Sequence, residues 1–231
     1  MVFAYYDLLQ ISVFAFVVIL AAVFSALLVS ISFHEFSHAF MANSLGDPTP
    51  RSLGRLSLNP AVHLAPMGTL LLLVGGFGWG KPVPFNPRYM TNAKVGTALV
   101  AAAGPLSNFL MAVIFSLPVR AGLVPRVGVL DVADFFNWQI SDYFGLFFTS
   151  LVTFNLLLGV FNLIPLAPLD GFKVAVGALP GELSRAFART EPWGMGILFL
   201  LFALPFVTGV SILSGIMLPL VDSASGLLLG S

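Results

Sequence analysis

The stretch His34-Glu35-Phe36-Ser37-His38 brings together three side chains that can support metal chemistry. On a helix, residues four apart lie on one face, so His34 and His38 can offer two ring nitrogens to the same metal ion. Zinc is the usual occupant of such a pair, and Glu35 can act as general base toward a water molecule that the metal activates. The pattern therefore predicts a zinc ion, one per chain, and hydrolytic chemistry with Glu35 as the catalytic residue.

These residues follow an apolar stretch, because residues 11–33 contain no charged side chain. A helix needs about 20 apolar residues to cross a bilayer core. Ionisable groups at the end of a membrane helix are energetically expensive and indicate a functional site. The alternative is a pair of histidines that only form hydrogen bonds inside a helix bundle. We favour the metal site, because two of the three histidines of the chain fall in this pattern.

The composition is that of a membrane protein. Of 231 residues, 58% are hydrophobic and 9% are charged, and the mean hydropathy is +0.99. We expect an all-α polytopic membrane protein that forms a single membrane-embedded domain over residues 1–231. The net charge of zero gives no indication of nucleic-acid binding, and the absence of cysteine excludes thiolate zinc sites. Because the first ten residues contain no Lys or Arg, we expect a permanent first span and not a cleaved signal peptide.

Hydrophobic stretches predict about four transmembrane helices, at residues 9–43, 94–118, 145–166 and 193–221. The last stretch contains Pro205 and Pro219 and could be one kinked helix or two short ones. Between the first two spans, four glycines interrupt an apolar segment, and prolines at 82, 84 and 87 favour extended backbone. We therefore predict a re-entrant, partly extended (β-like) loop at residues 64–88, shielded by protein or by a water-filled cavity.

The direction of each span decides whether a third metal ligand is available. If residues 64–79 do not cross the membrane, the first and third spans run the same way, and Asp170 lies at the same side as His34 and His38. If they did cross, Asp170 would be roughly 30 Å away. Asp170 could otherwise be a turn residue before Gly171. The first arrangement places eight of the ten Lys and Arg residues on the side of the metal site. The positive-inside rule then predicts a cell-membrane protein with a cytoplasmic active site and an external N-terminus.

With these features, the chain resembles the site-2 protease family of intramembrane zinc metalloproteases, in its short prokaryotic form without a PDZ domain. Four motifs carry the resemblance: Phe33-His34-Glu35-Phe36-Ser37-His38-Ala39, Gly104-Pro105-Leu106-Ser107-Asn108, Phe77-Gly78-Trp79-Gly80-Lys81-Pro82-Val83-Pro84, and Asn162 followed by Pro165 and Pro168-Leu169-Asp170-Gly171. The resemblance implies zinc ligands His34, His38 and Asp170, with Glu35 as general base. It also implies that the partner is a transmembrane protein substrate cut in or near the bilayer, such as an anti-sigma factor already cut by another protease.

Other residues have weaker assignments. Asn162 lies eight residues before Asp170, about two helical turns, so we expect both on the same helical face. Asn162 could contact the substrate or its oxyanion, or could form a helix–helix hydrogen bond. For Asn108, helix packing and a polar contact to the site are favoured over direct catalysis. Val83 and Phe85 belong to a segment that could pair with an unwound substrate as a strand edge, or could be a rigid surface loop. His63 is expected to be interfacial and not a metal ligand.

Two other functions fit parts of the pattern. A metal-binding membrane transporter should show polar residues along several helices, whereas the candidates here gather at one end of two helices. An inactive homologue could act as a scaffold, but zinc binding alone does not require Glu35. We therefore expect a zinc-dependent intramembrane endopeptidase, with the transporter and the scaffold as alternatives.

Overall fold

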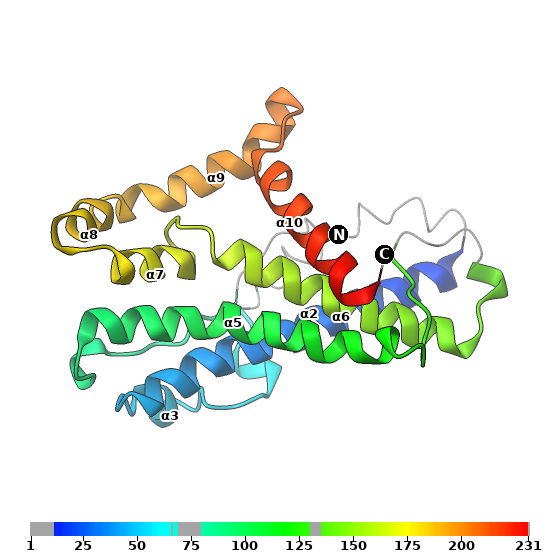
Figure 1. Cartoon of the computed structure of the whole chain (residues 1–231), viewed down its shortest axis with the longest axis horizontal. Helices are drawn as coiled ribbons and strands as arrows, with labels where there is room; N and C mark the ends of the chain where they lie inside the picture. Colours follow the sequence, from blue (N-terminus) through cyan, green and yellow to red (C-terminus); the bar gives the residue numbers. More distant parts are fainter. Residues whose placement is uncertain (1–11, 66, 69–79, 130–134, 231) are drawn as a thin grey trace.

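A computed structural model describes residues 12–65, 67–68, 80–129 and 135–230, and three quarters of these residues are helical (Figure 1). The described residues contain no named strand, only an isolated antiparallel bridge between Leu64 and Gly80. Five helices are long and apolar enough to span a membrane. The all-α, multi-pass membrane fold is therefore confirmed. The predicted start of the first span at residue 9 and most of the segment 64–79 lie outside the described residues.

Three long helices form the centre of the bundle: α2 (Val13–Ser44), α5 (Ala93–Arg120) and α6 (Ile140–Asn162). All three contact one another. Ser12 and Asn92 begin the first two, each accepting a hydrogen bond from a backbone N–H in the first turn. The bundle interior is apolar at the end away from the histidines, where Ile19, Val23 and Leu146 form a fully buried cluster.

The third span ends earlier than predicted. Helix α6 stops at Asn162, and two short helices follow, α7 (Asp170–Ala178) and α8 (Gly181–Ala188). The prolines at 165 and 168 explain the break, because proline removes a helical hydrogen bond and disfavours helix in the residue before it. Asn162 and Asp170 therefore lie on different helices. The prediction that they share one helical face was wrong.

The last apolar stretch is two helices, α9 (Glu191–Thr208) and α10 (Ile212–Leu229), one of the two alternatives that the sequence left open, and each is long and apolar enough to be a candidate span. Gly209 ends α9 with φ of 73°, a left-handed conformation that glycine adopts readily. Helix α9 begins beside the α6–α7 connection, and α10 ends beside α5, where Arg120 donates a 2.8 Å hydrogen bond to the Leu227 carbonyl. Together the two helices lead from the end of the bundle near Asp170 to the opposite end (Figure 1).

The described part of the connection between α2 and α5 packs near the C-terminal end of α2. It contains α3 (Thr49–Ser52) and two short 3₁₀ helices, η2 (Pro60–Val62) and η3 (Pro87–Tyr89). The Lys81 backbone N–H donates a 2.6 Å hydrogen bond to the His63 carbonyl, next to the Leu64–Gly80 bridge. His63 and Leu64 therefore lie beside Gly80 and Lys81. Most of the segment predicted to be re-entrant lies outside the described residues.

Residues 81–86 form neither helix nor strand and are anchored at both ends; because prolines 82 and 84 favour extended backbone, we call them the extended segment. The buried Arg55 guanidinium donates to the Val62 carbonyl and, at 3.4 Å, to the Lys81 carbonyl. At the other end, the buried Asp47 carboxylate accepts a 2.6 Å hydrogen bond from the Asn86 backbone N–H. These contacts hold the extended segment at the end of α2 that carries the two histidines.

Candidate metal centre

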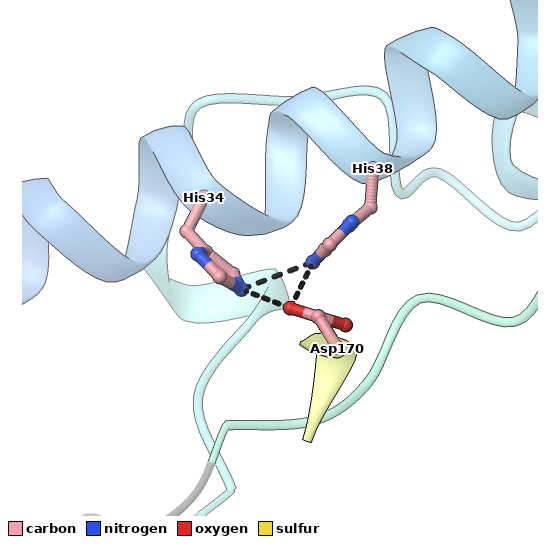
Figure 2. A group of neighbouring side chains, drawn as sticks. All are labelled: His34, His38 and Asp170. Carbon is pink, nitrogen blue, oxygen red and sulfur yellow. Dashed lines mark hydrogen bonds and ion pairs between the residues drawn. The ribbon is translucent and has the colours of Figure 1, made fainter. Parts of the chain in front are cut away.

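Two histidines of α2 and one aspartate of α7 converge at one point, as Figure 2 shows. The Nε2 atoms of His34 and His38 are 3.0 Å apart, and each lies 3.1 Å from Oδ2 of Asp170. Both histidines are buried, and their ligand atoms and that of Asp170 all lie within 4.8 Å of one another. These three residues, predicted as ligands from the sequence, form a group that could bind a metal ion.

The far nitrogen of each imidazole has its own acceptor. Nδ1 of His34 lies 2.6 Å from the amide oxygen of Asn108, and Nδ1 of His38 lies 2.7 Å from the Val100 carbonyl. Because carbonyl oxygens only accept, both Nδ1 atoms carry the proton, and both Nε2 lone pairs point into the cluster. This is the tautomer that a metal needs, and orientation by an outer hydrogen bond is typical of metal-binding histidines.

Gly104 of α5 makes room for the imidazoles. A Cβ atom at this position would lie 2.4 Å from Nε2 of His38 and 2.7 Å from Cε1 of His34. Contacts this short are not tolerated, so any side chain here would displace the ligands. Gly104 therefore makes space for the two ligand rings where α5 packs against α2.

Asn108 lies behind His34 in a buried amide network. Its Nδ2 donates to the Ser30 carbonyl at 3.1 Å and to Oδ1 of Asn155 at 2.9 Å, and Asn155 donates to the Leu151 carbonyl. The predicted polar contact of Asn108 to the site is present. The sequence analysis missed Asn155, although an amide in the middle of an apolar span was a sufficient signal.

Asp170 is placed by the start of α7 and by the packing of that helix. A Cβ on Gly171 would lie 2.3 Å from the Leu163 carbonyl oxygen, so the turn before α7 requires glycine after Asp170. Helix α7 packs on α5 through a close approach of Gly177 to Ala98. Oδ2 of Asp170 lies 3.1 Å from both Nε2 atoms, so its carboxylate completes the ligand group.

A pocket of about 140 Å³ opens beside the three ligands. Helices α2, α5 and α7, the end of α6 and the extended segment contribute its lining, which includes Glu35, Val83, Phe85, Asn162 and Lys173. Four of these were singled out from the sequence, and the structure brings them to one place. Lys173 was missed, although it lies one helical turn after Asp170 and so on the same face of α7.

Two predicted residues lie elsewhere. Asn108 is fully buried behind His34 and is not part of the pocket lining, so it is placed to orient the ligand and not to contact a substrate. His63 is fully buried, and its Nε2 donates a 2.6 Å hydrogen bond to the Ser57 carbonyl. His63 does not belong to the group formed by His34, His38 and Asp170, and its side chain is enclosed by protein.

Comparison with known proteins finds relatives named as zinc metalloproteases. YwhC of Bacillus subtilis, named as a candidate zinc metalloprotease, is 39% identical over 180 residues, which cover 78% of this chain and 78% of YwhC. Rip2 of Mycolicibacterium smegmatis, named in the same way, is 30% identical over 197 residues, covering 83% of this chain and 70% of Rip2. Zinc metalloprotease MJ0392 of Methanocaldococcus jannaschii is 27% identical over 188 residues, 80% of this chain and 43% of MJ0392.

No family model matches the chain, and no solved structure matches it. The first two relatives nevertheless share at least 30% of their residues with this chain over more than two thirds of both proteins. Together with the convergence of His34, His38 and Asp170 in a bundle of apolar helices, this similarity shows the family. The chain belongs to the site-2 protease family of zinc metalloproteases.

Proposed function

We propose that this protein is a zinc-dependent endopeptidase that hydrolyses peptide bonds in or near transmembrane segments of membrane proteins. The observation that carries the proposal is the position of the His34, His38 and Asp170 cluster. It lies between helices long enough to span a membrane, and it opens into a pocket that also contains Glu35. The site is thus accessible to a peptide that arrives within the bilayer or at its edge.

The ligand set suits zinc. Two imidazole nitrogens and one carboxylate oxygen are three protein ligands, which leave an open coordination position and are typical of catalytic zinc sites. Both Nδ1–H groups donate hydrogen bonds to acceptors outside the ligand group, and Gly104 provides the space for both rings. When bound, zinc would supply a Lewis acid that polarises the scissile carbonyl and lowers the pKa of water.

Glu35 is the proposed base. It directly follows His34 on α2 and lines the pocket, and no hydrogen bond ties its carboxylate to another described residue. The carboxylate takes a proton from the attacking water as the oxygen bonds to the scissile carbon. It then delivers that proton to the amide nitrogen as the C–N bond breaks. The products are a carboxylic acid and an amine, so no further reactant is needed.

Asn162 also lines the pocket, and we propose that it assists substrate binding or the reaction. One N–H of its side-chain amide donates to the Leu158 carbonyl at 3.0 Å. An amide has two N–H donors, so the second can serve a substrate carbonyl or the oxyanion that develops from it. In this proposal the Leu158 bond fixes the amide, and the free donor contributes to substrate binding or to the transition state.

The pocket dimensions favour an unwound substrate. An α-helix with its side chains is about 10–12 Å across and does not fit into a pocket of 140 Å³. The extended segment offers a place for unwound chain, because the N–H groups of Val83 and Phe85 form no hydrogen bond with described residues. Pro82, which precedes Val83, and Pro84, which lies between Val83 and Phe85, carry no N–H. We propose that a substrate strand pairs with Val83 and Phe85.

We also propose an orientation and a substrate. Because Lys and Arg residues gather at the metal-site end, we propose by the positive-inside rule that this end faces the cytoplasm and that the N-terminus faces outward. Cytoplasmic water can then reach the pocket. The proposed partner is a single-span signalling protein that another protease has already shortened.

One experiment separates this function from a transporter and from a scaffold. Purified protein in proteoliposomes should cleave members of a panel of single-span substrates and should give no zinc flux above that of empty liposomes. Zinc flux without cleavage would favour a transporter. Neither flux nor cleavage, with zinc still bound and the substrates still captured, would favour a scaffold.

A further inference from the structure

Lys173 projects into the pocket without an ion pair. It lies one turn after Asp170 on α7, and its Nζ sits 5.6 Å from the centre of the Phe85 ring, over the ring face. Glu35 and Asp170 line the same pocket, yet within the described ranges no salt bridge joins either carboxylate to Lys173. The one interaction described for this ammonium group is with an aromatic ring of the extended segment.

Phe85 contacts an apolar cluster as well as that ammonium group. It packs against the buried residues Ala42 of α2, Val100 of α5 and Met90. The extended segment is bonded near its two ends, at Lys81 and at Asn86, to groups that follow α2. The contact between Lys173 and Phe85 links this segment to α7 at the pocket.

We propose that Lys173 is a positioning residue that holds the extended segment against α7 through the Phe85 ring. Asp170 and Lys173 share one turn of α7, so this clamp fixes the edge that receives substrate relative to a metal ligand. The role rests on the proposed protease function, because it concerns how substrate is presented. Zinc does not need the clamp, since Lys173 and Phe85 are outside the ligand set.

The clamp predicts a particular pattern of kinetic change. A cation over an aromatic face contributes a modest stabilisation that grows as water is excluded, enough to change an equilibrium by about threefold to thirtyfold. Lys173→Met removes the charge but keeps the length of the side chain, and Phe85→Leu removes the ring but keeps an apolar residue. Each should raise KM by about that factor, leave kcat within about twofold, and leave zinc content unchanged.

The conservative variants and the double variant make the test specific. Lys173→Arg and Phe85→Tyr keep a cation–ring pair and should retain wild-type KM. Because both residues act through one contact, the KM of the double variant Lys173→Met/Phe85→Leu should be no higher than that of the single variant with the higher KM. Multiplied KM effects in the double variant, or a loss in kcat with Lys173→Met alone, would show that Lys173 acts on the substrate independently of the ring and would overturn the proposal.

A readout that does not depend on cleavage separates this inference from the proposed function. The chain has no cysteine, so spin labels can be placed at Tyr89→Cys, after the extended segment, and at Ala178→Cys on α7. We expect a narrow distance distribution in the otherwise wild-type protein and in Lys173→Arg, and a broader one in Lys173→Met. Equal distributions in all three would overturn the clamp. Absence of cleavage by the wild type would instead overturn the protease function.

Discussion

The amide oxygen of Asn108 on α5 lies 2.6 Å from Nδ1 of His34 on α2, at a site where both residues are buried. This bond orients the ring and sets which nitrogen faces the metal position. Asn155 of α6 completes the arrangement by accepting a hydrogen bond from the same Asn108 side chain. The three central helices of the bundle are thus connected by polar groups directly behind one metal ligand.

This relationship predicts that Asn108→Leu weakens zinc binding by about tenfold to a hundredfold, the usual effect of removing a partner of a metal-binding histidine. Asn155→Leu is the matched control. It also replaces a fully buried asparagine and also breaks the bond between the two amides, but it leaves the contact to His34. Zinc affinity is measured by competition with a chelator. Equal losses in the two variants would mean that the network only stabilises the helices.

Gly104→Ala should remove zinc while the helices still form. The added Cβ would lie 2.4 Å from Nε2 of His38, so the ring must leave the metal position. Gly215→Ala on α10 is the control, because no atom lies within 4 Å of a Cβ there. Metal analysis and circular dichroism of both purified variants make the test. Full zinc content in Gly104→Ala would contradict the geometry of the cluster.

Val83→Pro should reduce cleavage without loss of zinc, because proline removes the backbone N–H that we assign to substrate pairing. Val83→Ala shortens the same side chain but keeps this N–H, so it separates pairing from side-chain packing. Both variants are compared by rate of cleavage and by zinc content. If Val83→Ala loses as much activity as Val83→Pro, the effect comes from the side chain, and strand pairing is not supported.

Membrane orientation can be tested with single cysteines, since the native chain has none. Ser52→Cys and Leu183→Cys are exposed and lie at the metal-site end, and Leu123→Cys is exposed beyond the far end of α5. An impermeant thiol reagent should label only Leu123→Cys in intact cells and all three after permeabilisation. Labelling of Ser52→Cys or Leu183→Cys in intact cells would reverse the proposed topology.

Local spacing predicted that His34 and His38 share one helix face, and the direction of the spans together with the family resemblance indicated Asp170 as the third ligand. The structure brings these three residues together. The same kind of reasoning failed between Asn162 and Asp170. It assumed a continuous helix, whereas the prolines at 165 and 168 end α6 and the chain turns before α7. The two residues still line one pocket, because α6 and α7 pack around it and not because they share one helical face.

Features that depend on packing between distant elements could not be predicted. Nothing in the local sequence shows that Gly104 faces the imidazoles or that Asn155 bonds Asn108, because both facts depend on how three helices rotate against one another. The contact of Lys173 with Phe85 likewise joins two elements that are far apart in the chain. The division of the last stretch at Gly209 was left open, since proline can kink a membrane helix as well as end it.

The most direct test of the proposed chemistry compares zinc content with cleavage in Glu35→Gln. This change keeps the size of the side chain and removes the base, while His34, His38 and Asp170 remain. Zinc content should equal that of the wild type, and cleavage should fall by about two to four orders of magnitude. His38→Ala and Asp170→Ala should lose zinc and cleavage together. If Glu35→Gln carries zinc and cleaves at the wild-type rate, Glu35 is not the base and the mechanism is wrong.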